Sequence, residues 1–263
     1  MHNTSEATCS SKQFGLFRII LGLYLSVHLT MTAFHYDDFL WPLHLNPPAT
    51  PASFWLFPIG ILLSLLFTFG IYRKLSAVGI WIILRFLVYK NIYYYGMNLD
   101  YVGFLLLLTL FIPNGESLAL KKENPNWQMP QNVYFGAWLV FTLSMTMSGI
   151  NKLLISPEWR SGETIQILFT ESAAYHSETI KSLVLSFPAF FKLLTWLTLI
   201  LEMISVFILF NRRLRYYYSV STFFVFTSVS LFLAMSEVGF SVIIFEILLF
   251  DSNFWKRSYA TKN

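Results

Sequence analysis

Long apolar stretches that carry no charge constrain this chain more than any other feature. The stretches 131–151 and 216–236 contain no Asp, Glu, Lys or Arg at all. Only 12% of the 263 residues are charged, whereas a soluble domain carries roughly 25%. A chain with so little polar surface is stable only if much of its exterior faces lipid, so the sequence predicts an integral membrane protein.

A helix that crosses the hydrocarbon core of a bilayer needs about 20 largely apolar residues. By this measure the sequence predicts an all-α, polytopic bundle of about eight spans. They lie near 14–34, 54–72, 75–95, 101–119, 131–151, 188–210, 216–236 and 238–254. The fourth and the last are the shortest in apolar core, so a count of seven stays open. The membrane domain is expected over 14–254, between tails at 1–13 and 255–263.

The basic residues orient this bundle, because cytoplasmic loops of membrane proteins carry an excess of Lys and Arg. Eleven of the 18 Lys and Arg fall on the same side as the N-terminus, three fall on the other side, and four lie within spans. This asymmetry predicts a cell-membrane protein with both termini in the cytoplasm. It also places the charge of +4 in short clusters between spans, which argues against a nucleic-acid binder.

Two outer segments are long enough to carry function. The segment 35–53 contains four prolines and is expected to be an irregular loop. The second segment runs from Lys152 to Phe187. After Pro157 it is expected to form an amphipathic outer helix, with an apolar side made by Ile165, Leu168, Phe169 and Ala173, which either lies on the membrane or caps the bundle.

Metal and disulfide chemistry receive little support from the sequence. The single cysteine, Cys9, cannot form an intrachain disulfide. Four histidines are expected on the outer side, but none has the spacing to a second ligand that metal sites use; they are His28, His35, His44 and His176. We therefore expect no metal site.

Ionisable residues at membrane depth are costly and usually face the interior of the bundle. Arg85 and Glu202 lie near the middle of two predicted spans, so we expect them to form a buried ion pair, with a functional or a purely structural role. Arg18, Lys90 and Lys192 lie nearer the ends of spans, where long side chains extend toward the interface.

The strongest candidate site is at the outer end of the fifth span. Gly149 allows close backbone approach there, and Lys152 lies at the edge of the apolar zone, followed by Trp159 and Gly162. Burial disfavours the charged form of a lysine, and a lysine in such a place can act as a base near neutral pH. The alternative is an interfacial lysine that simply extends into water beside an interfacial tryptophan.

These motifs together resemble a known superfamily. Ser148-Gly149-x-x-Lys152-Leu153 followed by Trp159-x-x-Gly162 is similar to the membrane domain of vitamin K-dependent gamma-carboxylase-like proteins, the horizontally transferred transmembrane domain (HTTM) superfamily. Further agreement over about 14–254 comes from Tyr72-Arg73, the segments 91–100 and 110–118, Leu201-Glu202-Met203 and the basic turn 211–215.

The resemblance implies that Lys152 is the base that starts oxidation of a reduced quinone, with Glu202 as its catalytic partner. A peptide substrate would then be modified at the outer face. It also assigns substrate or pocket roles to Arg85, Asn91, Asp100, Gly149, Trp159 and Gly162. Stand-alone members of the superfamily, among them a membrane protein that matures a sporulation-delaying peptide toxin, are the closer match in size.

Two departures favour an alternative. The stretch 226–231 lacks a histidine that the superfamily commonly has there, and we expect no large soluble part of the kind that binds propeptide in the carboxylases. The alternative is a non-enzymatic accessory protein for peptide maturation, export or immunity. A transporter is less favoured, because the sequence has neither repeated halves nor interrupted helix pairs.

Overall fold

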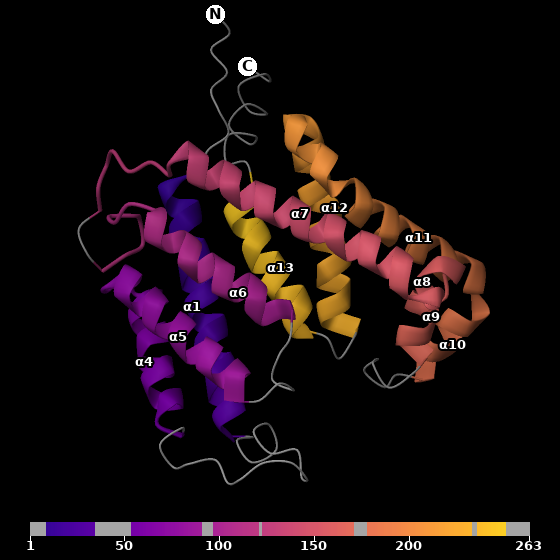
Figure 1. The fold of residues 1–263 in the computed structure, drawn as a ribbon, viewed down its shortest axis with the longest axis horizontal. Coiled ribbons are helices and arrows are strands. Elements are labelled where there is room, and N and C mark those ends of the chain that lie inside the picture. Colours follow the sequence, from indigo (N-terminus) through magenta and orange to yellow (C-terminus); the bar gives the residue numbers. More distant parts are fainter. Residues whose placement is uncertain are drawn as a thin grey trace, which may run out of the picture. The chain divides into compact units, whose positions relative to one another are not determined.

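The computed structural model describes residues 9–34, 54–90, 97–120, 123–170, 178–232 and 236–250, and within these ranges the chain is helical and contains no strand (Figure 1). The chain divides into two compact units. The first consists of residues 1–134 and 251–263, and the second of residues 135–250.

Each of the eight predicted spans overlaps a helix among the described residues. In the first unit these are α1 (Ser11–Phe34), α4 (Leu56–Thr68), α5 (Arg73–Lys90) and α6 (Met97–Leu108), which continues into the 3₁₀ turn η2 (Thr109–Phe111). α7 (Gln131–Ile155) begins at the end of the first unit and belongs mostly to the second. The second unit also holds α11 (Pro188–Ile204) with its 3₁₀ extension η3 (Ser205–Phe210), α12 (Arg212–Phe232) and α13 (Ser236–Leu249).

Three of the described helical segments are long and apolar enough to cross a membrane: Ser11–Phe34, Gln131–Ile155 and Pro188–Phe210. Three shorter segments are also apolar, Leu56–Thr68, Asp100–Phe111 and Val238–Leu249. α5 and α12 belong to neither set, since α5 contains four basic residues and α12 is rich in Ser, Thr and Tyr. The helices therefore indicate a membrane protein, and the count of about eight spans stays a prediction.

α1 shows why lipid is the expected surroundings. One face, with Phe14, Leu21 and Leu25, is fully buried, while Leu23 and Val27 on the other side are 48% and 57% exposed. A helix that is apolar on every side is not stable when one side faces water. The exposed apolar face is what contact with lipid requires.

Small residues bring the helices of the first unit together. A Cβ added to Gly22 of α1 would lie 2.1 Å from Thr68 Oγ1 of α4, so a larger residue does not fit there. α4 and α5 are joined by the tight turn 69–72, in which Gly70 has a φ of +73°. Because the turn is so short, the two helices are sequential neighbours that pack against each other.

In the second unit, hydroxyl groups join α7 to the end of α11. Thr146 Oγ1 lies 2.8 Å from Ser205 Oγ, and it accepts the backbone N–H of Val206 at 3.1 Å. Ser205 Oγ in turn donates to the carbonyl oxygen of Thr142 at 2.7 Å. These side chains take backbone partners at the point where α11 tightens into η3, which explains how the segment changes its helical geometry without losing hydrogen bonds.

The segment after α7 is helical after Pro157, as predicted, but it does not form one continuous helix. It consists of α8 (Pro157–Ser161), α9 (Thr164–Thr170) and α10 (Glu178–Ser186). Gly162 ends α8 with a φ of +82°, a left-handed conformation that stops a helix. Ile165, Leu168 and Phe169 lie half-buried in α9, whereas Ala173 and the proline-containing segment 35–53 lie outside the described residues.

Candidate functional site

Lys152 and Glu202 form an ion pair between α7 and α11. Lys152 is in the last turn of α7, and its Nζ lies 2.5 Å from Oε1 of Glu202. The Glu202 side chain is 8% exposed and the Lys152 side chain 29%. The carboxylate is therefore the inner partner of the pair, and the ammonium is the partner that other molecules can reach.

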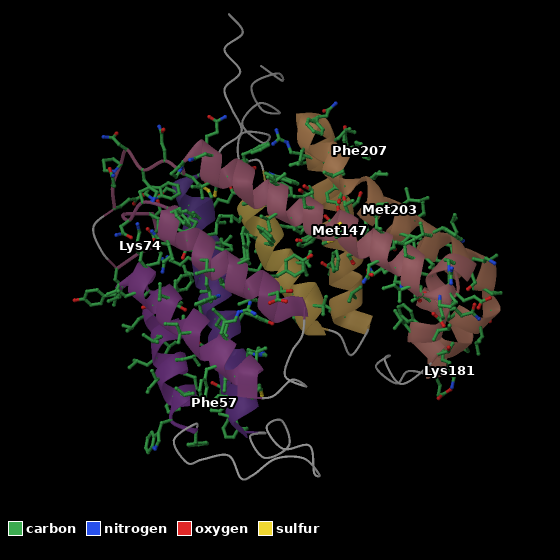
Figure 2. All side chains as sticks on the ribbon, in the orientation of Figure 1. Phe57, Lys74, Met147, Lys181, Met203 and Phe207 are labelled. Carbon is green, nitrogen blue, oxygen red and sulfur yellow. The ribbon has the colours of Figure 1, made fainter. Side chains whose placement is uncertain are left out.

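Gly149 allows this pairing by letting two backbones meet. A Cβ at position 149 would lie 2.9 Å from the backbone nitrogen of Met203 and 3.0 Å from Cβ of Glu202. Figure 2 labels Met147 of α7 and Met203 of α11 where these two helices run alongside each other. Any larger residue at 149 would push α11, and with it Glu202, away from Lys152.

Trp159 also contacts the lysine. The Lys152 Nζ lies 4.5 Å from the centre of the Trp159 ring, a distance at which an ammonium is attracted to an aromatic face. The chain reaches this position because Ser156 separates α7 from α8 and Pro157 starts α8 with its fixed φ. The ammonium is thus held between a carboxylate and an indole ring.

Gly162 docks the end of α8 onto α11. A Cβ at this position would lie 2.7 Å from both Lys192 Cγ and Trp196 Nε1. The following helix is tied to α11 as well, since the backbone N–H of Ile165 donates to Thr195 Oγ1 at 3.2 Å. Sequence reasoning missed both Trp196 and Thr195, although Thr195 lies seven residues before Glu202 and therefore on the same face of α11.

Glu202 has one oxygen with nothing to bind among the described residues. Its Oε1 accepts from Lys152, but its Oε2 is buried without a hydrogen-bond partner. A buried carboxylate oxygen without a donor is costly. A hydroxyl group of a ligand or a water molecule is the kind of group that would satisfy it.

Each member of the predicted Arg85–Glu202 pair has an ion-pair partner within its own unit, which the sequence analysis did not predict. Arg85 Nη2 lies 2.8 Å from Oδ1 of Asp100, and both side chains are more than a third exposed. Gly103 makes room for this arginine, since a Cβ there would lie 2.9 Å from Arg85 Nη2. The structure therefore brings Lys152, Glu202, Gly149, Trp159 and Gly162 together, and pairs Arg85 with Asp100 in the other unit. Asn91 lies outside the described residues.

Arg18 does not extend to the interface either, because it is fully buried. Its Nε lies 3.1 Å from Oε1 of Glu116, and Arg73 Nε reaches the same oxygen at 3.2 Å. The two guanidinium groups also donate to carbonyl oxygens, Arg18 at the end of α4 and Arg73 at the start of η2 and just after it. Cations at these helix ends are stabilised by the helix dipole, so this cluster fixes the loops of the first unit.

A second buried carboxylate lies in the second unit. Glu246 of α13 is 1% exposed, and Thr222 of α12 donates a hydrogen bond to its Oε1. Among the described residues no three His, Cys, Asp or Glu side chains gather in a way that would hold a metal ion. Of the four histidines considered from the sequence, His28 is buried in α1, and His35, His44 and His176 lie outside the described residues.

Comparison with protein-family models, curated proteins and solved structures finds no match to this chain.

Proposed function

We propose that this chain is a multi-pass membrane protein of the HTTM type that modifies or matures a secreted peptide at the outer membrane face, with Lys152 as the base. The observation that supports this most is the geometry of the pair. Lys152 Nζ lies 2.5 Å from Glu202 Oε1, and the lysine is the more exposed of the two.

The pair offers a route to a neutral amine in apolar surroundings. Transfer of a proton from Lys152 Nζ to Glu202 Oε1 leaves the net charge of the pair at zero, so it buries no new charge. The amine that results has a lone pair and can accept a proton from a substrate. Glu202 then holds the transferred proton, which makes it a catalytic partner of the lysine.

The surroundings suit a substrate that arrives from the outer leaflet. The excess of basic residues on the other side of the predicted bundle supports an outer position for Lys152. Trp159 provides aromatic surface beside the pair, and tryptophan is common where apolar and aqueous phases meet. A lipid-soluble co-substrate or a membrane-bound peptide would meet Lys152 at this interface.

A reduced quinone is the cofactor that the resemblance suggests, and the unpartnered Oε2 of Glu202 fits a hydroxyl donor. Such a quinone supplies an oxidisable hydroxyl group. Glu202 would hold such a group through a hydrogen bond to Oε2, and Lys152 would be the base beside it. Mass spectrometry of the lipids that co-purify with the chain tests this assignment: a stoichiometric quinone supports it, and ordinary phospholipids alone argue against it.

The function itself is tested in cells that express the chain in its native genetic surroundings. The masses and amounts of small secreted peptides are compared between the wild-type chain, Lys152→Ala and the matched control Lys181→Ala, an exposed lysine of α10. We expect a peptide whose mature mass disappears only in Lys152→Ala, at unchanged membrane levels of the protein. If the mature peptide persists in Lys152→Ala, the accessory alternative replaces the enzymatic proposal.

A further inference from the structure

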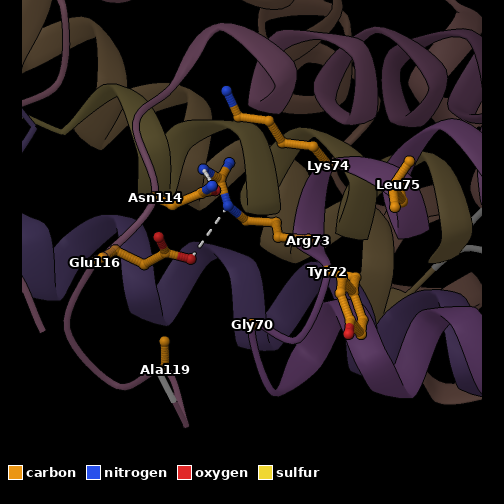
Figure 3. Close-up of a pocket in the computed structure, with 9 residues that line it drawn as sticks. Gly70, Tyr72, Arg73, Lys74, Leu75, Asn114, Glu116 and Ala119 are labelled. Atoms are coloured by element: carbon orange, nitrogen blue, oxygen red, sulfur yellow. Dashed lines mark hydrogen bonds and ion pairs between the residues drawn. The ribbon is translucent and has the colours of Figure 1, made fainter. Parts of the chain in front are cut away.

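A small pocket lies at the turn between α4 and α5, well away in sequence from Lys152. Its walls are the first turn of α5, from Tyr72 to Leu75, and the loop from Asn114 to Glu116, with Gly70 and Ala119 closing the sides (Figure 3). The cavity volume is about 210 Å³. That exceeds the roughly 30 Å³ of one water molecule and falls below the roughly 300 Å³ of pockets for drug-sized ligands, so the space suits a headgroup-sized ligand.

The charge around this pocket is positive. Glu116 is the one carboxylate in its wall, and both Arg18 and Arg73 bind the same oxygen of that carboxylate (the Arg73 pair is the dashed line in Figure 3). Two guanidinium groups against one carboxylate leave a net charge of +1. Lys74 adds a further positive charge, and none of the residues that the structure describes pairs with its ammonium group.

The pocket wall contains several hydrogen-bond donors. Arg73 Nη2 donates to Oδ1 of Asn114 at 3.0 Å, which leaves the amide nitrogen of Asn114 as the end that can bind a ligand. The first N–H groups of a helix have no partner within the helix, and here they belong to the pocket wall from Arg73 to Leu75. With the Lys74 ammonium they form a set that suits an anion with several acceptor oxygens.

The rim of the pocket is apolar and exposed. Tyr72 is 62% exposed and Leu75 is 72% exposed. A free inorganic anion has no apolar part that would contact these side chains, whereas the acyl chains of a lipid would pack against them. A positive pocket beside exposed apolar side chains therefore fits an amphiphile with an anionic headgroup.

We propose that this pocket binds the phosphate group of an anionic phospholipid. The phosphate accepts from Lys74, from the Asn114 amide and from the first turn of α5, and the acyl chains lie along Tyr72 and Leu75. The predicted orientation agrees, since it places this end of the bundle at the cytoplasmic leaflet, where anionic lipids gather.

The test is native mass spectrometry of the full chain in detergent, titrated with phosphatidylglycerol and, separately, with phosphatidylcholine. We expect phosphatidylglycerol to bind at least fivefold more tightly. Lys74→Gln should weaken its binding by about fivefold, because one lysine near an anionic lipid is worth about 1 kcal/mol. Asn114→Asp keeps the acceptor that Arg73 needs but turns the free donor into a negative oxygen, and it should weaken binding further.

Lys181→Gln is the matched control, because it removes one exposed lysine from α10 and leaves the pocket unchanged. The proposal is overturned if Lys181→Gln weakens binding as much as Lys74→Gln, or if the two lipids bind equally. Full competition by inorganic phosphate at the lipid concentration would also overturn it, because a free anion would then be the occupant. Thermal unfolding of each variant shows that any loss of binding is not a loss of fold.

Discussion

Glu116 is the residue on which the loops of the first unit depend most, and Glu116→Gln measures that dependence. The substitution keeps the shape of the side chain and one acceptor oxygen, but it removes the negative charge. Arg18 Nε at 3.1 Å and Arg73 Nε at 3.2 Å then face a neutral amide, and all three side chains are at most 2% exposed. Removing one partner of a buried ion pair costs about 3–5 kcal/mol.

The shift in melting temperature follows from the size of the folded region. A change of 1 kcal/mol moves the midpoint by about 2–4 °C for 150–250 residues, so Glu116→Gln should melt about 6–20 °C below wild type. The assay is thermal unfolding in a mild detergent, followed by near-ultraviolet circular dichroism. Asp100→Asn is the control, because it makes the same chemical change in a pair whose two side chains are 36% and 41% exposed.

An exposed pair is worth at most about 1 kcal/mol, so the Asp100→Asn midpoint should fall by less than about 4 °C. Equal shifts in the two variants would refute the reasoning. In that case burial would not explain how much the Glu116 ion pairs contribute to the free energy of unfolding.

Three further predictions concern the second unit. Gly149→Ala should destabilise the chain by about 1–3 kcal/mol, because its Cβ would meet the α11 backbone. Gly136→Ala in the same helix, where nothing lies within 4 Å, should be neutral or up to about 1 kcal/mol stabilising. Unfolding of both variants in detergent checks this difference. Lys181→Cys should react with an impermeant maleimide added outside intact cells, whereas the parent chain, whose cysteine is buried, should stay unlabelled. If Lys181→Cys is labelled only after lysis, this position faces the cytoplasm and the predicted membrane orientation is wrong. Ser156→Ala should raise the pKa of Glu158, because the Ser156 hydroxyl donates to this carboxylate at 2.6 Å and is the main cause of its lowered pKa. The stability from this hydrogen bond is present above the ordinary pKa of Glu158 and is lost as the pH falls through its lowered pKa. The pKa of Glu158 is measured by NMR titration in both proteins. Identical titration curves would show that the Ser156 hydroxyl does not lower this pKa.

The positions of the helices follow from the sequence because each apolar run is long enough to need its own helix in lipid. That requirement is local, so it can be derived without knowing what packs against what. The break at Gly162 was missed, because the apolar spacing of Ile165, Leu168 and Phe169 continues across the segment. The left-handed backbone at Gly162, together with its contact with Lys192 and Trp196, is what ends α8 there.

The partners of the charged residues could not be derived in the same way. Arg85 and Glu202 lie at similar depth in two predicted spans, but similar depth does not imply contact. Asp100 follows Arg85 by only fifteen positions and pairs with it instead. Arg18 was expected at the interface because its position near a helix end is visible in the sequence, whereas its partner Glu116 comes from a loop almost one hundred residues later.

The Lys152 site was the most predictable part of the molecule. Gly149, Lys152, Trp159 and Gly162 stand close together in sequence, so one short turn after α7 is enough to assemble most of the site. Glu202 comes from another helix, and no sequence pattern near either residue predicts its pairing with Lys152. The close approach of α7 and α11 at Gly149 is what brings it within 2.5 Å.

The central claim is that Lys152 acts as a base and not only as a cation, and Lys152→Arg tests this most directly. An arginine at this position keeps the positive charge, the pairing with Glu202 and the contact with Trp159, but it does not give up its proton near neutral pH. The measurement is the amount of mature secreted peptide per membrane-inserted molecule, in wild type and in this variant. The account predicts that Lys152→Arg loses maturation as completely as Lys152→Ala while melting at a temperature close to that of wild type. Maturation at the wild-type level in Lys152→Arg would contradict it and leave Lys152 with a structural role.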